Sequence, residues 1–353
     1  PSLESWHAAA TGHAELIRMP SRIHSRPMPN VQLVDLRVRD DRSSGAISRP
    51  LHAAIDQTLA EQGQVILLLN RRGFATTIQC PACGHVVACP DCDLPLTHHR
   101  DGGKAICHYC DYTIPTPPWC PACRFDGIRY GGLGTQKLEV EIKSRFPNAA
   151  IARMDSDTMR RPGSHQRVLS AFRGGEVDIL LGTQMIAKGL DFPNVLLVGV
   201  INADSALHFP DFRAAERTFQ LVTQVAGRTG RGDRGGRVIV QTFSPEHPAI
   251  QAASRHDYEA FANTEMAHRR KYNYPPIGNV ARIILRGSVE QVTEAIAEAL
   301  LARLEQARQR LGREVRILGP APPPISKLRG KFRFHILMQA TEAAALIETI
   351  RAA

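Results

Sequence analysis

The sequence predicts an α/β protein with a parallel sheet, an inserted cysteine-rich module and a small α+β domain at its carboxy-terminal end. Continuous apolar runs alternate with amphipathic stretches, all eight cysteines lie in one segment, and the alternation changes near residue 258. Apolar strands separated by helices are typical of parallel sheets that are covered on both faces. We therefore divide the chain into an α/β domain (31–79 and 126–257), an insertion (80–125) and a last domain (258–353), preceded by residues 1–30.

The elements of the α/β domain are expected where apolar runs and helical periodicity follow one another. The first strand is expected at Val65–Leu69, with the cysteine-rich insertion directly after it. Residues 1–30 are polar and are interrupted by Pro20, Pro27 and Pro29, which predicts the end of a preceding domain and a linker. Further strands are expected at 128–130, 151–154, 178–181, 195–201 and 237–242, and helices at 136–145, 165–172 and 214–226. In the last domain, helices at 258–272 and 289–310 and a final helix accompany strands at 281–286 and 331–338.

The net charge and the lengths of the apolar runs indicate which classes of partner to expect. The 353 residues include 44 basic and 34 acidic ones, a net charge of +10, which indicates an anionic partner such as nucleic acid, unless the whole proteome is basic. The longest apolar runs are far shorter than the roughly 20 residues of a membrane helix, so no membrane partner is expected. No signal peptide follows Pro1, which predicts a cytoplasmic fragment of a longer protein.

The eight cysteines form four C-x-x-C pairs: Cys80/Cys83, Cys89/Cys92, Cys107/Cys110 and Cys120/Cys123. Two thiolates three positions apart on a tight turn can bind one metal, and two pairs make the four-sulfur set that zinc prefers. We predict two structural zinc ions. Disulfides would need an oxidising compartment, and a redox C-x-x-C pair would be single. Iron–sulfur clusters use the same ligands but other spacings.

A hairpin decides how the pairs are grouped. Leu94–His99 and Lys104–Ile106 flank the turn Asp101-Gly-Gly103, which predicts two antiparallel strands. The hairpin brings its flanking turns together, so one ion is expected between the inner pairs (Cys89, Cys92, Cys107, Cys110) and one between the outer pairs (Cys80, Cys83, Cys120, Cys123). Because thiolates fill both sites, the histidines of the segment are expected on the surface or around the ligands: His85, His98, His99 and His108.

Two further motifs indicate binding of a nucleotide or another ligand. Residues 224–231, Gln-Val-Ala-Gly-Arg-Thr-Gly-Arg, end a predicted helix. Arg228 and Arg231, three positions apart, can both reach the γ-phosphate of a nucleotide held by a neighbouring lobe. The alternative is a helix terminus whose dipole favours basic residues. Residues 182–193 follow a buried strand, where α/β folds place ligands. The alternative here is a helix-capping loop.

Together these motifs resemble a known family. Residues 224–231 resemble motif VI of superfamily 2 helicases, and residues 182–193 resemble motif V. The strings at 70–75, 134–136, 210–217 and 319–322, with all eight cysteine spacings, are similar to the PriA family of bacterial replication-restart helicases. Residues 1–6 resemble the tail of the family's motif III. The chain is identified as a member of this family over essentially its whole length.

The resemblance implies the RecA-like second lobe of an ATP-dependent 3′→5′ DNA helicase that recognises stalled or abandoned forks and promotes primosome assembly. It implies ATP with Mg²⁺ as substrate, and two structural zinc ions with the nested grouping given above. Arg231 would be the arginine finger, with Arg228 beside it. The resemblance assigns Gly189, Asp191 and Gln224 to the nucleotide, and Thr183, Gln184 and Lys188 to DNA.

For the last domain the resemblance implies contacts with forked and single-stranded DNA and with the acidic tail of the single-strand-binding protein. Lys331, Arg333 and His335 lie where the family's pocket for that tail is expected, and His335 departs from the glutamine of some members. Other primosome proteins and the loader of the replicative helicase are the further implied partners. The alternative is that these basic residues only solvate an outer strand.

Two helicase parts are missing from the sequence. It contains no G-x-x-x-x-G-K-[ST] string, and no Asp-Glu pair follows a buried strand to bind magnesium. In the family both belong to the preceding lobe, so we expect the carboxy-terminal half of the protein, inactive alone. The alternative function is a non-catalytic, zinc-containing DNA-binding scaffold of the primosome.

Overall fold

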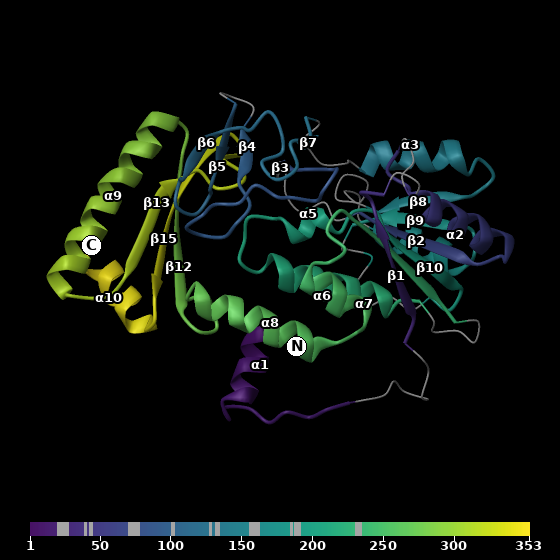
Figure 1. Ribbon diagram of the computed structural model, residues 1–353, viewed down its shortest axis with the longest axis horizontal. Coiled ribbons are helices and arrows are strands. Elements are labelled where there is room, and N and C mark those ends of the chain that lie inside the picture. Colours follow the sequence, from purple (N-terminus) through teal and green to yellow (C-terminus); the bar gives the residue numbers. More distant parts are fainter. Residues whose placement is uncertain are drawn as a thin grey trace.

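A computed structural model describes residues 1–19, 28–38, 41, 45–69, 78–99, 103–126, 129–130, 135–154, 163–183, 186, 192–229 and 235–353. Figure 1 shows the large sheet on the right, the carboxy-terminal sheet and helices on the left, and the cysteine-rich module (residues 80–125) above and between them. Within the described residues, no helix combines the length and the apolar character that a membrane crossing requires. The predicted fold class is confirmed, with a parallel sheet, the inserted module and a separate α+β domain.

The large sheet has six strands, all parallel, in the order β1-β11-β10-β2-β9-β8. Apart from Gln64 at the start of β2, the residues of β2, β9 and β10 are apolar or glycine, and every residue of these three strands is buried. This follows from covering both faces, since neither side of the strand can then carry polar groups. The strands are β1 (Asn30–Asp35), β2 (Gln64–Leu68), β8 (Ile151–Met154), β9 (Ile179–Gly182), β10 (Val195–Val200) and β11 (Arg237–Thr242).

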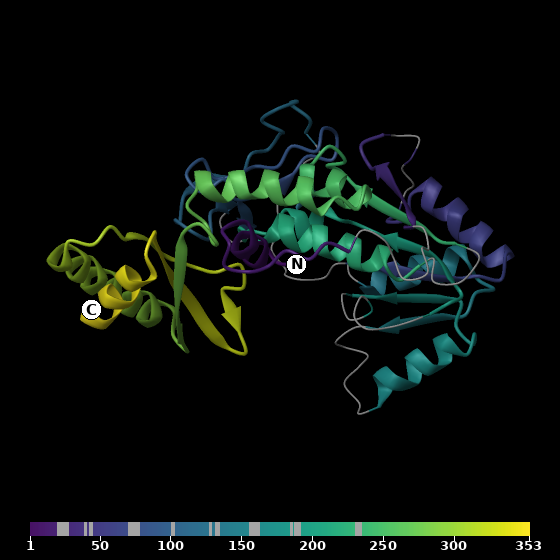
Figure 2. The ribbon, with the colours of Figure 1, turned by 90° about the horizontal axis from the view of Figure 1, so that it is seen from below.

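Helices cover both faces of this sheet. On one face α2 (Arg49–Ala60) and α3 (Thr135–Arg145) bury Leu51, Ile55 and Leu138 against the strands. On the other face lie α4 (Ser164–Arg173), α6 (Ala214–Ala226) and α7 (Pro248–Ser254), with the short α5 (Asp204–Leu207) before α6. The longer α8 (Tyr258–Lys271) runs alongside α6 and α7 (Figure 2).

Two strands differ from expectation. The cysteine-rich module follows the second strand of the large sheet, because β1 precedes β2, so the expectation of an insertion after the first strand is wrong. β1 is an edge strand whose burial is broken by polar positions, and its short sequence gives no continuous apolar run. The strand expected near residue 129 is β7 (Arg129–Tyr130), which pairs antiparallel with β3 (Ile78–Gln79) and not with the large sheet. The β3–β7 pair brings the entry and exit of the module together.

The first residues form a helix that packs on the large domain. α1 (Leu3–Ala10) buries Leu3 completely in the core of that domain, and Trp6 packs edge-on against Tyr258 at 5.4 Å between ring centroids. The amide of Leu3 donates to a carboxylate oxygen of Glu216 in α6 at 3.1 Å. Together with the hydrogen bond from the Tyr258 hydroxyl to the carbonyl of Ser2 at 3.2 Å, these contacts hold α1 on the large domain.

The carboxy-terminal domain is an antiparallel sheet with helices on one face. Its strands lie in the order β12-β15-β13, and α9 and α10 bury Leu304 and Leu346 against Ile336 and Met338. Phe261 of α8 belongs to the core of the large domain, whereas the domain boundary predicted at residue 258 places it in the last domain. The elements are β12 (Asn279–Gly287), α9 (Glu290–Leu311), β13 (Arg316–Ala321), β14 (Lys327–Leu328), β15 (Lys331–Ala340) and α10 (Ala343–Ala352).

Candidate metal, nucleotide and DNA sites

The structure brings the eight cysteines into two sets of four. In each set the four sulfur atoms lie within 4.8 Å of one another, and the members are Cys80, Cys83, Cys120 and Cys123 in the outer cluster and Cys89, Cys92, Cys107 and Cys110 in the inner cluster. The sulfurs of Cys80 and Cys123 are 3.6 Å apart, and those of Cys89 and Cys110 are also 3.6 Å apart. A tetrahedral zinc with bonds of about 2.3 Å has sulfur–sulfur edges of about 3.8 Å. Both clusters therefore fit a four-sulfur zinc site.

Each C-x-x-C pair lies on the same tight turn. The carbonyl of the first cysteine accepts a hydrogen bond from the amide four residues later, at 2.9 to 3.0 Å in all four turns. That later residue has a positive φ each time, at Gly84 (79°), Asp93 (52°), Asp111 (64°) and Arg124 (62°). Glycine and aspartate tolerate this left-handed conformation better than other residues, and Arg124 adopts it with a larger steric cost. The repeated turn points both sulfurs of a pair to one side.

A three-stranded antiparallel sheet sets the grouping. β4 (Thr97–His99) and β5 (Lys104–Ile106) form the predicted hairpin, with Thr97 opposite Ile106, and β6 (Thr113–Pro115) adds a third strand. The hairpin places the two turns that flank it side by side, so the inner pairs meet. The nested grouping predicted from the hairpin agrees with this geometry.

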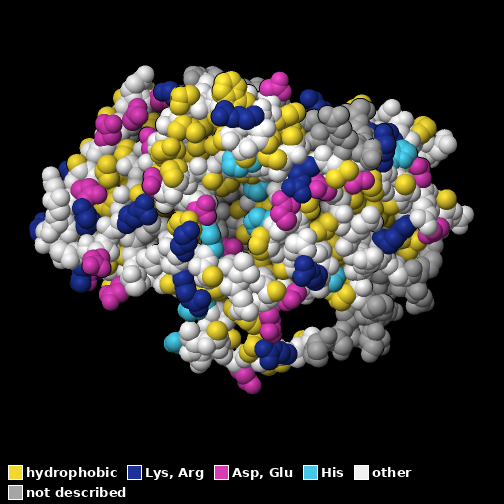
Figure 3. All heavy atoms as spheres, in the orientation of Figure 1, with side chains coloured by type: hydrophobic (Ala, Val, Ile, Leu, Met, Phe, Trp, Pro, Cys, Tyr) yellow, Lys and Arg dark blue, Asp and Glu magenta, His cyan; other side chains and the backbone are white. Residues whose placement is uncertain are grey.

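The two clusters differ in exposure. Three of the four inner cysteines are buried, in one apolar cluster with Phe212 of the large domain and Tyr274 and Leu337 of the carboxy-terminal part. In the outer cluster Cys123 is exposed and Cys83 is half-buried. Figure 3 shows hydrophobic side chains gathered at the top of the view, where Figure 1 places the module. The inner cluster is thus part of a core shared with both neighbouring domains.

His108 and His335 join the module to the carboxy-terminal sheet. His108 is 1% exposed and its Nδ1 lies 2.5 Å from the carbonyl oxygen of Pro322, so of the two positions expected for this histidine, the surface or the surroundings of the ligands, it does not take the surface one. The Nε2 of His335 donates to the carbonyl of His108. Burial lowers the pKa of His335 to about 4, so the ring is neutral near pH 7. Neither contact can be predicted from local sequence, because 214 residues separate His108 from Pro322 and 227 separate it from His335.

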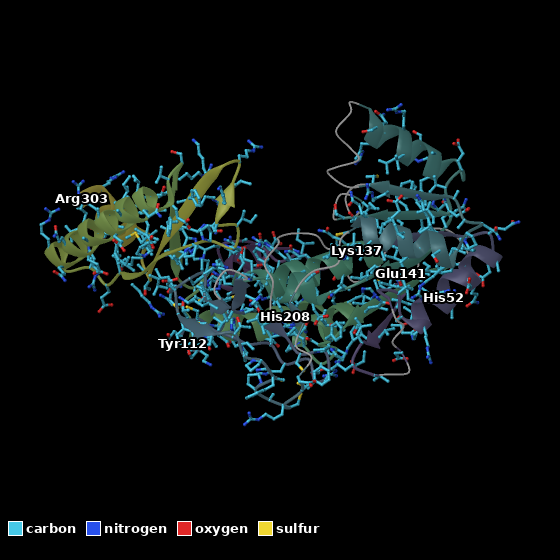
Figure 4. All side chains as sticks on the ribbon, turned by 90° about the horizontal axis from the view of Figure 1, so that it is seen from above. His52, Tyr112, Lys137, Glu141, His208 and Arg303 are labelled. Carbon is cyan, nitrogen blue, oxygen red and sulfur yellow. The ribbon has the colours of Figure 1, made fainter. Side chains whose placement is uncertain are left out.

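A buried carboxylate fixes the module to the large sheet. Asp204, the first residue of α5 and four residues after the end of β10, accepts hydrogen bonds from Gln79 at 3.0 Å, from the Ser244 hydroxyl at 2.8 Å and from the Phe243 amide at 2.8 Å. Burial alone would raise the pKa of Asp204, but these bonds and nearby His208 lower it to about 2. His208 is labelled near the centre of Figure 4, close to where the parts of the molecule meet. Sequence reasoning missed Asp204, although its place at the carboxyl end of a parallel strand is a known ligand position.

The described part of motif VI lies at the end of α6. Gln224 is exposed and Arg228, one turn later, is half-buried. The next residue, Thr229, is fully buried and its hydroxyl donates to the carbonyl of Val195 at 2.9 Å. Val195 begins β10, directly after the motif V segment. The described end of motif VI therefore lies beside the start of β10, two residues after motif V ends.

Thr183, which is predicted to contact DNA, does not lie beside Thr229. It follows β9 at the carboxyl edge of the sheet, and its carbonyl accepts from the amide of Ile186 at 3.0 Å. Gly182 of β9 is level with Leu68, whereas Val195 is level with Gln64 at the other end of β2. Thr183 and Thr229 thus lie at opposite edges of the sheet. The remaining predicted residues lie outside the described part of the chain: Gln184, Lys188, Gly189, Asp191 and Arg231.

The predicted partner residues are exposed to different degrees. Lys331 is exposed and Arg333 is half-buried, but His335 is 1% exposed beneath the cysteine-rich module. Arg286 lies opposite Arg333 in the sheet, and Arg282 follows on the same side of β12. Burial and these two arginines lower the pKa of Arg333. The accessible face is therefore made of arginines and Lys331, and Arg282 and Arg286 could have been found from the period of two along β12.

Three family models match parts of the chain. They are described as "Primosomal protein N C-terminal domain" (residues 270–353), "PriA DNA helicase Cys-rich region (CRR) domain" (89–115) and "Helicase conserved C-terminal domain" (134–233). The replication restart protein PriA of Bacillus subtilis (strain 168) is 45% identical over 356 aligned residues, which cover 99% of this chain and 44% of that protein. The chain belongs to the PriA family. It matches the carboxy-terminal half of such proteins.

Other PriA relatives give the same coverage. The replication restart protein PriA of Synechocystis sp. is 41% identical over 96% of this chain and 42% of its own length. The chain therefore spans about half the length of the relatives that it matches. Among solved structures, the C-terminal domain of the DEAD-box protein Dbp5 aligns with 66% of this chain and 86% of that chain, at 13% identity and a TM-score of 0.32. A TM-score this low carries no argument about function.

The PriA-specific matches fall on the features described above. The Cys-rich region model covers the inner cluster and its hairpin, and the C-terminal model covers β12 to α10. The helicase model runs from just before α3 to the end of motif VI. The parts that a general helicase would share and the parts specific to PriA proteins are thus adjacent in one chain.

Proposed function

We propose that the chain is the second motor lobe, zinc module and carboxy-terminal domain of an ATP-dependent DNA helicase that restarts replication at stalled or abandoned forks. The observation that carries the proposal is the buried bond between Thr229 and the carbonyl of Val195, which brings the ends of motifs V and VI together beside PriA-specific domains. Translocation in the 3′→5′ direction and a cytoplasmic location belong to the same proposal.

The nucleotide would be ATP with Mg²⁺, held mainly by the preceding lobe. Arg231 and Arg228 would reach its γ-phosphate, and Gly189, Asp191 and Gln224 would line the same site. A positive group at a transferring phosphoryl group stabilises the charge that develops there. Because Thr229, three residues after the end of α6, is a buried anchor, the arginines on either side of it would be held in place when the two lobes close.

The two clusters would each hold one structural zinc ion. Four thiolates complete the coordination of zinc and leave no position for a reacting water, so the metal would supply fold stability and no chemistry. In the inner site the ion would also stabilise the apolar cluster that joins the module to both neighbouring domains.

DNA would lie along Thr183, Gln184 and Lys188 at the carboxyl edge of the large sheet. The acidic tail of the single-strand-binding protein would bind the accessible arginines and Lys331, without a direct contact to buried His335. Guanidinium groups bind carboxylates through paired hydrogen bonds, which suits such a tail. Other primosome proteins and the loader of the replicative helicase remain proposed partners.

The test is unwinding by the full-length protein. Forked DNA with a single-stranded 3′ or 5′ tail is incubated with ATP, and strand separation is measured together with phosphate release. The proposal expects DNA-stimulated ATP hydrolysis and unwinding of the substrate that offers a 3′→5′ track. Binding to forks without any ATP hydrolysis would instead support a non-catalytic primosome scaffold.

A further inference from the structure

The largest fully buried side chain among the described residues is an arginine, Arg269. All three of its nitrogens have partners: Nε donates to Glu265 at 2.8 Å, Nη2 to Glu216 at 3.1 Å, and Nη1 to the carbonyl of Pro275 at 2.6 Å. The guanidinium also lies over the ring of Phe212, 4.8 Å from its centroid. A charge taken wholly out of water is tolerated only where it is paired and hydrogen-bonded, as Arg269 is at each of its three nitrogens.

The partners of Arg269 lie in different segments of the chain: α6, α8 and the connection to the carboxy-terminal sheet. Glu216 is on α6, the helix that ends in motif VI, and about 15 Å of helix separate it from Ala226, two residues before Arg228. Arg269 and Glu265 are on α8, and Pro275 lies in the connection from α8 to the carboxy-terminal sheet. The node formed by Glu216, Glu265 and Arg269 therefore joins the motor helix to the chain that enters the carboxy-terminal domain.

The aromatic neighbours extend this node to the zinc module. Phe212 stacks on Tyr274 with ring centroids 4.9 Å apart and planes 9° from parallel. The hydroxyl of Tyr274 lies 3.4 Å from the carbonyl of Cys92, an inner-cluster cysteine. On the other side of the node, the second oxygen of Glu216 accepts the amide of Leu3 in α1.

This arrangement resists relative movement of α6 and α8. Separating Glu216 from Arg269 would leave opposite charges unpaired in a dry interior, which is far more costly than breaking an exposed ion pair. Packed interiors also transmit displacement rather than absorb it. A shift of α6 at its motif VI end is thus expected to move α8 and the connection at Pro275 with it.

We propose that Arg269 and Glu216 are positioning residues that couple DNA binding by the carboxy-terminal domain and zinc module to ATP turnover at motif VI. The inference rests on the proposed motor function. Neither residue touches nucleotide or DNA; both act by holding α6 in a fixed relation to the DNA-binding part. DNA bound there would favour one position of α6, and therefore of Arg228, through this node.

The test compares Glu216→Gln and Arg269→Lys with wild type in the full-length protein. Glutamine has one oxygen and one amide, so it cannot accept from both Arg269 and the Leu3 amide. Lysine keeps the charge but cannot pair with three acceptors in the plane of a guanidinium. The matched control is Glu305→Gln, which removes one carboxylate charge from the half-buried surface pair between Glu305 and Arg308 on α9.

The measured quantity is the ratio of DNA-stimulated to DNA-free ATP turnover, at a temperature where melting curves show every variant folded. The proposal expects this ratio to fall about tenfold in both variants, because coupling free energies commonly correspond to factors of 5 to 150. DNA-free turnover, DNA affinity and zinc content should stay at wild-type values, and Glu305→Gln should change nothing.

The possible outcomes distinguish a failure of the proposed function from a failure of the proposed coupling. If wild-type protein shows no DNA-stimulated turnover, the proposed function itself is wrong. If wild type is stimulated and either folded variant keeps the same ratio, Arg269 and Glu216 have no coupling role. A parallel loss of stimulated and DNA-free turnover would also overturn the proposal, since it would show a purely structural role.

Discussion

Replacing Asp204 by asparagine should loosen the attachment of the cysteine-rich module to the large sheet. Asparagine resembles the protonated carboxyl group, so the cost of the change can be taken from the pKa of Asp204. That pKa is lowered from 3.8 to about 2 in the folded protein, which corresponds to roughly 2 kcal/mol in favour of the carboxylate. Because the folded pKa is the lower one, this stabilisation is present above about pH 4 and is lost as the pH falls through about 2.

Amide hydrogen exchange at pH 7 measures the effect locally. The cost of roughly 2 kcal/mol should make exchange at the ends of β10 and β11 and at Gln79 about 30-fold faster, since each factor of ten is about 1.4 kcal/mol. Asp56→Asn is the control, because Asp56 is 58% exposed and its ion pair is with half-buried His52. Exchange in Asp204→Asn that stays within twofold of wild type would refute the view that this carboxylate anchors the module.

Two further predictions concern metal and pH. Zinc analysis should return two ions per chain. Because Cys123 is exposed, a chelator should remove the outer ion in a fast phase, before the inner ion, and Cys123→Ser should abolish that phase. A single phase of zinc release from the wild-type protein would contradict this order. Burial and nearby His208 lower the pKa of His247 to about 4, so the stability due to its neutral ring is present above about pH 6.5 and is lost as the pH falls towards 4. NMR titration should find that pKa. His247→Asn keeps an acceptor for the Ala249 amide, and it should reduce the loss of stability between pH 7.5 and 5.5 by about 1.3 kcal/mol. The control His13→Asn, at an exposed position, should not change that loss.

Local sequence was sufficient where a short segment determines the geometry. The strands β9 and β10 and residues Val65–Leu68 of β2 are continuous buried runs without polar side chains, and the hairpin between Cys92 and Cys107 fixes which cysteines meet. β1 was missed because an edge strand with alternating burial is short and partly polar. The apolar positions of α2 are clear only once the sheet that they cover is known.

The contacts between domains could not be predicted in this way. His335 has the sequence context of an accessible basic strand, but the cysteine-rich module covers it through a bond that spans 227 residues. Arg269 and Glu216 lie 53 residues apart, and each alone resembles an ordinary surface charge on a helix. Such pairs depend on how separately folded units pack, which leaves no periodic signal in either segment.

The central claim, that motif VI of this chain acts on ATP, is tested most directly by the ATP turnover of full-length Arg231→Ala in the presence of single-stranded DNA. An arginine finger contributes about 10³-fold or more, so turnover should fall by that factor while melting temperature, zinc content and DNA affinity stay unchanged. Arg231→Lys should not restore full turnover, because an ammonium group lacks the planar fork of a guanidinium. Turnover at the wild-type rate in folded Arg231→Ala would contradict the account.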